Sequence, residues 1–307
     1  MNAHPVAGSL GCSVAALGGA ERRGRIAALF ANSAHLVTDD GEYLTLGDTT
    51  LPPHPYSILW KGFSPRPEIG WELTVTTDGV FHGGRRLVSF RGVRLYSPPV
   101  HARPMAGGEA RRLCLTATCA AASVTLSEGM FHALFSAGSG HAPRAAALHQ
   151  DGVLEHGLAD QGRRVASHMA AALRGSDWEA FCRAAEALAG MGAGLTPAGD
   201  DFLAGVLSAL RFHGQSRKKD VLPPYVGQKA VTMADARTSR FSAFLLRCSA
   251  VGRIARPLAD WLYAVHCGNV GRAAALTPSI AALGHTSGLD TLAGMVLALR
   301  NIPGDAP

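Results

Sequence analysis

Residues 190–205 read GMGAGLTPAGDDFLAG, a glycine-rich loop that leads directly into the start of a helix. Thr196 is a favourable N-cap, and Pro197 suits the first helical position because it lacks the backbone N–H that would be unpaired there. Apolar residues then recur at helical spacing, so we expect a helix over about Pro197–His213 with the buried stripe Leu203, Val206, Leu207 and Leu210. The loop therefore belongs to a predominantly helical region.

The start of this helix carries two carboxylates, Asp200 and Asp201. Backbone N–H groups and the helix dipole favour an anion there, but two carboxylates would repel it unless a cation or a protonated amine lay between them. We therefore interpret the segment as an anion-plus-cation site in which Asp200 and Asp201 are catalytic. The loop would supply the substrate-binding residues Gly192, Gly194, Thr196 and Gly199. The alternative is structural: the aspartates complement the helix dipole, and the glycines make a tight interhelical turn.

A second segment, GHTSGLDTLAGMVLALR at residues 284–300, repeats this pattern more weakly. The alignment places Asp290 opposite Asp201, and for that reason we expect Asp201 to be more buried than Asp200. We also expect the two helix starts to converge on one pocket. The second start would contribute His285 as a catalytic residue and Thr286, Ser287 and Gly288 as substrate-binding residues. The alternative is a packing echo, in which Gly205 and Gly294 only allow close helix contact.

The first segment resembles the signature of a bacterial family typified by the AllH (YlbF) subunit of oxamate carbamoyltransferase. The resemblance is strongest over Gly190–Arg211, extends more loosely to Thr238–Arg253 and Gly288–Gly294, and concerns the amino-terminal third only in outline. It implies a carbamoyltransferase subunit that acts on oxamate or a related ureido or carbamoyl compound in nitrogen catabolism, such as purine degradation. It leaves open a non-catalytic ligand-binding or assembly subunit of such an enzyme.

The same resemblance predicts the binding partners. Carbamoyl transfer needs mainly positioning and charge stabilisation, so we expect no organic cofactor, while a Mg²⁺ ion is compatible with the paired carboxylates. The expected partners are a small anionic substrate, such as carbamoyl phosphate or oxamate, and other subunits of a hetero-oligomeric enzyme. We expect no metal site of histidines or cysteines. The six cysteines lack zinc-site spacing, and no metal-binding pattern joins His132, His141, His149, His156 and His168.

Composition and charge exclude two classes of partner. The formal net charge is +6, but the arginines are scattered in pairs and accompany no nucleic-acid motif, so we expect no nucleic-acid partner. The chain has no run of about twenty apolar residues and no secretory leader pattern, which predicts a cytoplasmic protein without a membrane span.

The chain changes character once along its length. Short alternating runs between about Arg25 and Ser97 predict β-strands with hairpin turns at Asp40–Gly41 and Asp78–Gly79. Helical periodicity dominates afterwards. We therefore predict an α+β protein, in which a loose tail (residues 1–24) precedes a small antiparallel β domain (25–98, a sheet or barrel) and a larger, mainly α-helical domain (113–302).

Overall fold

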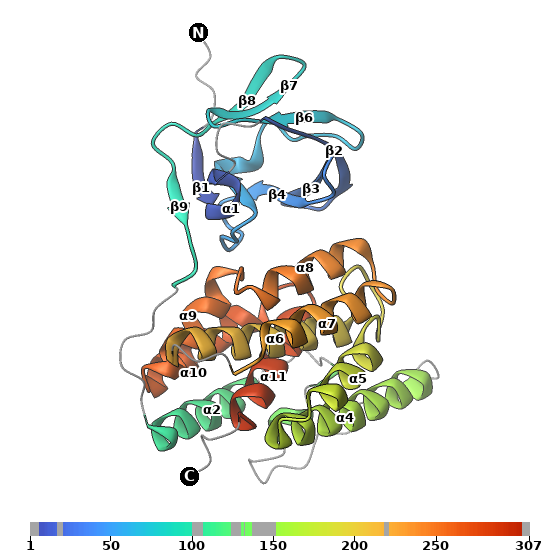
Figure 1. The fold of residues 1–307 in the computed structure, drawn as a ribbon. Coiled ribbons are helices and arrows are strands. Elements are labelled where there is room, and N and C mark those ends of the chain that lie inside the picture. Colours follow the sequence, from blue (N-terminus) through green and yellow to red (C-terminus); the bar gives the residue numbers. More distant parts are fainter. Residues whose placement is uncertain are drawn as a thin grey trace. The chain divides into compact units, whose positions relative to one another are not determined.

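The computed structural model describes residues 6–16, 21–99, 107–123, 130–131, 133–136, 152–217 and 221–302. The chain divides into two compact units, each of which is visible in Figure 1. The β unit comprises Met1–Pro98 together with Arg253–Arg256, and the helical unit comprises Pro99–Gly252 and Pro257–Pro307. The predicted α+β class, with a β region before a larger helical region, is confirmed.

Nine strands form one sheet in the described part of the β unit. Their order is β8-β7-β6-β2-β3-β4-β5-β1-β9, and their bounds are β1 Ala7–Gly11, β2 Arg22–Leu29, β3 Ser33–Thr38, β4 Tyr43–Asp48, β5 Ser57–Trp60, β6 Glu72–Val75, β7 Gly79–His82, β8 Arg85–Ser89 and β9 Arg94–Tyr96. The pairs β4–β5 and β1–β9 are parallel, whereas the other neighbouring pairs are antiparallel. The sheet curls into a half-barrel, and a bridge from Val6 to Ser89 links the start of β1 to β8 at the far edge.

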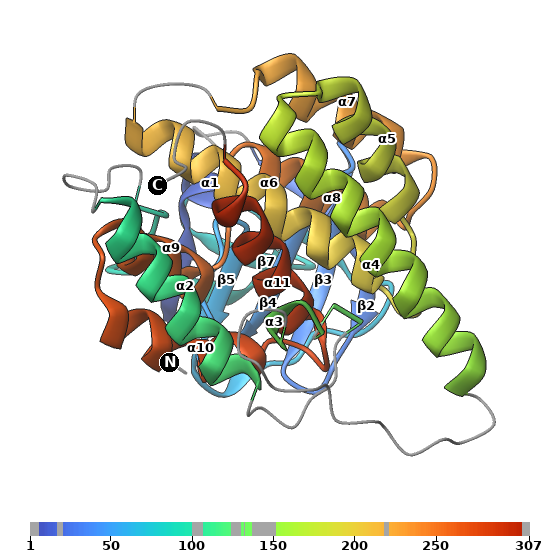
Figure 2. The same cartoon turned by 90° about the horizontal axis from the view of Figure 1, so that it is seen from below.

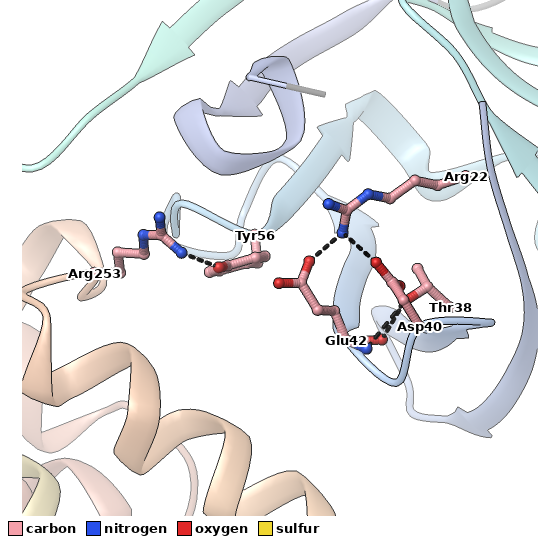
Figure 3. Close-up of polar contacts among 6 residues, drawn as sticks. All are labelled: Arg22, Thr38, Asp40, Glu42, Tyr56 and Arg253. Carbon is pink, nitrogen blue, oxygen red and sulfur yellow. Dashed lines mark hydrogen bonds and ion pairs between the residues drawn. The ribbon is translucent and has the colours of Figure 1, made fainter. Parts of the chain in front are cut away.

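The predicted hairpin between β3 and β4 turns at Asp40–Gly41. Gly41 has a φ of +82°, a backbone conformation that favours glycine. Beside the turn, the guanidinium group of Arg22 binds the carboxylates of Glu42 and Asp40, the latter at 3.4 Å (Figure 3). Thr38 Oγ1 donates a hydrogen bond to Asp40 in the same cluster. The second predicted turn, at Asp78–Gly79, joins β6 to β7.

The segment before residue 25 corrects the expectation of a loose tail. It contains β1, which pairs with both β5 and β9, and the short helix α1 (Cys12–Ala15). Ala7, Leu10 and Val14 are almost fully buried, and this apolar burial favours an ordered strand over a tail. The segment is rich in alanine and glycine, which are uncommon in strands, so its sequence did not predict β1.

The segment Arg253–Arg256 belongs to the β unit although it lies far along the chain. The Arg253 guanidinium donates to the Tyr56 hydroxyl group and lies 5.5 Å from the centre of its ring (Figure 3). The carbonyl oxygen of Ile254 accepts a hydrogen bond from Tyr96 Oη at 3.0 Å. Two tyrosines of the β unit therefore hold this returning segment.

The helical unit begins with α2, five residues before the expected boundary at residue 113, and residues 100–106 lie outside the described residues. Its helices are α2 Gly108–Ser123, α3 Ala133–Ser136, α4 Gly152–Gly175, α5 Trp178–Leu188, α6 Ala198–Arg217, α7 Pro224–Asp235, α8 Arg240–Ala250, α9 Arg256–His266, α10 Val270–Ala281 and α11 Ser287–Arg300. The predicted apolar stripe of α6 is buried. None of the helices in the described ranges has the length and apolar character that a membrane span requires.

Helices α6 and α11 pack against each other in the middle of the helical unit, between α2 and α10 on one side and α4 and α5 on the other (Figure 2). A Cβ atom added to Gly205 would lie 2.0 Å from the Thr291 carbonyl oxygen, and one added to Gly294 would lie 2.0 Å from that of Phe202. Equivalent residues of the two aligned segments therefore make the same contact in both directions. The two helices cross on a local two-fold axis, and close packing is confirmed for both glycines.

The neighbouring helices extend this symmetry. Asp177 caps the start of α5 by accepting a hydrogen bond from the third helical residue, and Asn269 caps α10 in the same way. The residues before these caps, Ser176 and Gly268, both have positive φ values of 53° and 69°. Helix α7 packs on α5 as α2 packs on α10. Helices α5 and α10 thus share a cap geometry and each packs on one further helix, whereas α9 does not pack closely on α10 as α4 packs on α5.

Candidate functional site

The starts of α6 and α11 meet, as the repeated sequence predicts. Thr196 Oγ1, in the loop before α6, lies 3.2 Å from Ser287 Oγ, at the first residue of α11. Interactions with these two hydroxyl groups also favour the ionised form of the nearby Asp201 carboxyl group and partly offset the rise of its pKa. Side chains from the two aligned segments therefore form one connected polar cluster.

Asp201 and its counterpart Asp290 are the buried acidic groups of this cluster, with exposed fractions of 8% and 0%. Asp290 Oδ1 accepts a hydrogen bond from the Phe131 backbone N–H at 3.0 Å, and this bond together with an interaction with the Thr286 side chain partly offsets the rise of its pKa. Burial raises the pKa of Asp290 to about 7. Burial also raises the pKa of Asp201 to about 7, with smaller contributions from the charges of Asp290 and Asp200. Both carboxyl groups therefore titrate close to neutral pH.

One oxygen of each carboxyl group, Oδ2, is buried and has no hydrogen-bond partner among the described residues. Buried polar atoms in proteins are almost always paired, so two such oxygens in one cluster distinguish it from ordinary packing. We call Asp201 and Asp290 the acid pair. Asp290 was absent from the sequence-based set of site residues, although its alignment with Asp201 was the signal that could have identified it.

Asp200 has a different environment from the acid pair. Its carboxylate accepts hydrogen bonds from the Gly190 N–H at 2.9 Å, from Ser242 Oγ at 2.8 Å and from Thr238 Oγ1. Asp200 is 1% exposed, so the expectation that Asp201 is the more buried aspartate is wrong. Its donors come from the loop and from the start of α8, and this geometry gives Asp200 a structural role. A catalytic role for Asp200 stays a prediction.

Two of the glycines expected at the substrate site are required by packing within the protein. A Cβ atom at Gly199 would lie 2.1 Å from the Leu188 carbonyl oxygen, and one at Gly288 would lie 1.8 Å from that of Ile280. Gly194 differs, because it has a φ of +98° and open space where a Cβ atom would point. Of these three glycines, Gly194 is the one beside which a ligand could approach the backbone.

In the first turns of α6 and α11, backbone amides that could bind an anion are already paired within the protein. An anion at a helix start is bound by N–H groups without an internal partner. In α6 the amides of Gly199, Asp200 and Asp201 donate to the carbonyl oxygens of Met191 or Pro197, at 2.8 to 3.1 Å. In α11 the amides of Gly288, Leu289 and Asp290 donate in the same way to Leu283 or Thr286, at 2.9 to 3.1 Å. These six amides are therefore not available to bind an anion.

The predicted cap at Thr196 is also corrected. Helix α6 begins at Ala198, one residue after Pro197, and the Thr196 hydroxyl group pairs with Ser287 Oγ. The hydroxyl group thus contributes to the cluster and not to the helix end. The hydroxyl group pairs with a side chain of α11 and not with a backbone N–H in the first turn of α6.

His285 lies exposed in the turn before α11, two residues from Ser287. It is placed beside the cluster by chain connectivity, and its catalytic role stays a prediction.

Among the described residues, no group of three histidine, cysteine, aspartate or glutamate side chains could hold a metal ion. His132, His141 and His149, together with the side chain of His156, lie outside the described residues.

Comparison with known proteins identifies this same region. Residues 188–299 match the family described as oxamate carbamoyltransferase subunit AllH, which confirms the resemblance carried by the glycine segments. The match spans both helix starts and both members of the acid pair. No solved structure significantly matches the chain.

Proposed function

We propose that this chain is a subunit of a carbamoyltransferase that acts on oxamate or a related ureido or carbamoyl compound. The observation that carries the proposal is the coincidence of the family match with the polar cluster. Residues 188–299 contain Thr196 and Ser287, which join the two helix starts, and both members of the acid pair.

In the proposed reaction, a nitrogen atom of the acceptor attacks the carbonyl carbon of a donor such as carbamoyl phosphate. A C–N bond forms, the C–O bond to phosphate breaks, phosphate leaves, and the attacking nitrogen loses a proton. Asp201 is the proposed base because its pKa of about 7 leaves it partly ionised near neutral pH. The Thr196 and Ser287 hydroxyl groups favour the ionised form of this carboxyl group, which is the form that accepts the proton.

The remaining predicted residues have proposed supporting roles. We assign the anionic end of the substrate to the loop at Gly192–Gly194, because open space lies beside Gly194. His285, exposed next to the start of α11, is proposed to exchange protons with solvent. This chemistry depends on positioning and proton transfer and requires no organic cofactor.

A reconstitution experiment tests the proposal. Carbamoyl transfer by the assembled enzyme is measured with wild-type chain, without the chain, with Asp201→Asn, and with Asp235→Asn as a control on an exposed aspartate of α7. We expect Asp201→Asn to lower turnover by at least about a hundredfold, the scale of general-base catalysis, while assembly is retained. Full turnover by Asp201→Asn would exclude the catalytic role. If, in addition, the enzyme failed to assemble only when the chain was left out, the chain would be a non-catalytic assembly subunit.

A further inference from the structure

We infer that Asp201 and Asp290 together bind the –NH₂ group of a carbamoyl compound, with Oδ2 of each carboxyl group accepting one of its two N–H bonds. This inference rests on the proposed function and names the chemical group that the site recognises. It also assigns Asp290, which lies on the second helix start, to the substrate site.

The pattern of donors and acceptors in the cluster supports this assignment. The hydroxyl groups of Thr196 and Ser287 pair with each other beside Asp201, and the Phe131 N–H donates to Asp290 Oδ1. The first-turn amides from Gly199 to Asp201 and from Gly288 to Asp290 donate to backbone carbonyls. The two unpaired atoms, Oδ2 of Asp201 and Oδ2 of Asp290, are acceptors when their carboxyl groups are ionised. A group that pairs with them must therefore supply hydrogen-bond donors or positive charge.

The local two-fold symmetry favours a group with two equivalent donors. The unpaired oxygens come from equivalent positions on α6 and α11, the helices that cross at Gly205 and Gly294. A planar –NH₂ group carries two N–H bonds that diverge, so it can donate to one oxygen on each side. Phosphate and carboxylate groups carry acceptors and negative charge, and beside Asp201 and Asp290 they would be repelled.

A divalent cation is the competing occupant. Mg²⁺ in proteins is often bound by one or two carboxylates together with waters and substrate phosphates. The described residues offer the acid pair without a third histidine, cysteine, aspartate or glutamate ligand. A site for an –NH₂ group prefers the ligand with N–H donors, whereas a cation site prefers the ligand with more negative charge. Binding affinities of ligands that differ only in their N–H donors therefore distinguish the two occupants.

The test uses two matched pairs of small molecules with the full chain and isothermal titration calorimetry. Oxamate is compared with oxalate, which has a carboxylate where oxamate has its amide. Carbamoyl phosphate is compared with acetyl phosphate, in which a methyl group replaces –NH₂. We expect each –NH₂ compound to bind at least about tenfold more tightly than its partner, because the partner leaves buried acceptors unpaired.

A substitution in the acid pair checks that these residues cause the preference. Asp290→Asn keeps an oxygen for the Phe131 N–H and places an amide –NH₂ where Oδ2 was, so a donor would then face the donors of the ligand. We expect this variant to fold and to lose most of the preference within each pair. Asp235→Asn, the surface control, should keep the wild-type preference. Thermal unfolding of each variant establishes that it is folded.

Three results would overturn the inference. They are equal affinity within both pairs, no binding of any of the four compounds, and a preference that survives in folded Asp290→Asn. A fourth result would assign the site to a metal. In that case the chain would bind Mn²⁺, a paramagnetic substitute for Mg²⁺, and would show no preference for oxamate over oxalate. Asp201→Asn and Asp290→Asn would each abolish the Mn²⁺ binding. Turnover is a separate measurement. A chain that prefers oxamate but is dispensable for turnover would overturn the proposed function alone.

Discussion

Replacement of Asp290 by asparagine should make the protein more stable at alkaline pH. In the folded protein the pKa of Asp290 is raised by burial from an ordinary value of 3.8 to about 7. Between these pH values the folded state keeps the proton that the unfolded chain releases, so stability falls as pH rises through this window and then levels off. Asparagine has the shape of the protonated carboxyl group and cannot ionise.

The size of the effect follows from the pKa difference. Ionising a carboxyl group whose pKa is raised from 3.8 to about 7 costs the folded state about 4 kcal/mol at pH 8, and about 2 kcal/mol at pH 5. The free energy of unfolding of Asp290→Asn should therefore exceed that of the wild type by about 4 kcal/mol at pH 8 and by about 2 kcal/mol at pH 5. The difference between the two pH values is independent of any packing effect of the amide.

Urea unfolding followed by tryptophan fluorescence at pH 5 and pH 8 measures these differences. Asp200→Asn is the control, because its carboxylate accepts three hydrogen bonds and its replacement should destabilise the protein at both pH values, by about 1.5–3 kcal/mol. If Asp290→Asn destabilised the protein equally at both pH values, Asp290 would be an ionised and paired carboxylate in the folded state. Asp290 would then not be a carboxyl group with a pKa raised by burial.

Three other substitutions test the helix crossing, the loop and the histidine. Gly205→Ala should lower the free energy of unfolding by about 1–3 kcal/mol through overpacking at the helix crossing. Gly271→Ala, which has open space in α10, should raise it by up to about 1 kcal/mol. Equal effects of the two substitutions in urea unfolding would contradict the close crossing of α6 and α11. Gly194→Val should weaken oxamate binding in calorimetry, since a β-branched side chain resists its φ of +98°, and unchanged affinity would leave a turn role alone. His285→Gln should lower kcat at least about tenfold, and an unchanged kcat would remove His285 from the chemistry.

Features set by neighbouring residues could be predicted from the sequence. The buried stripe of α6 follows from helical periodicity, and the hairpin at Asp40–Gly41 follows from turn chemistry. The meeting of Thr196 and Ser287 was predictable for a different reason. The two segments share one pattern, and two copies of one pattern pack symmetrically in this protein.

Features set by distant residues could not be predicted. Asp200 and Asp201 are adjacent and chemically identical, yet one is paired with donors near α8 and the other faces α11. The partner of Asp290, Phe131, lies 159 residues away and leaves no periodic signal. The parallel pairing of β1 with β9 likewise joins segments that lie far apart in the sequence. Tertiary contacts of this kind decide which carboxylate is structural and which has an unpaired oxygen.

A crystal structure of the chain with bound oxamate tests most directly whether the acid pair is a site for –NH₂ groups. We expect the amide nitrogen of oxamate at about 3 Å from Oδ2 of both Asp201 and Asp290, with the carboxylate end directed away from them. Oxamate bound elsewhere on the chain, oxamate with its carboxylate toward the acid pair, or a metal ion between the two aspartates would contradict it.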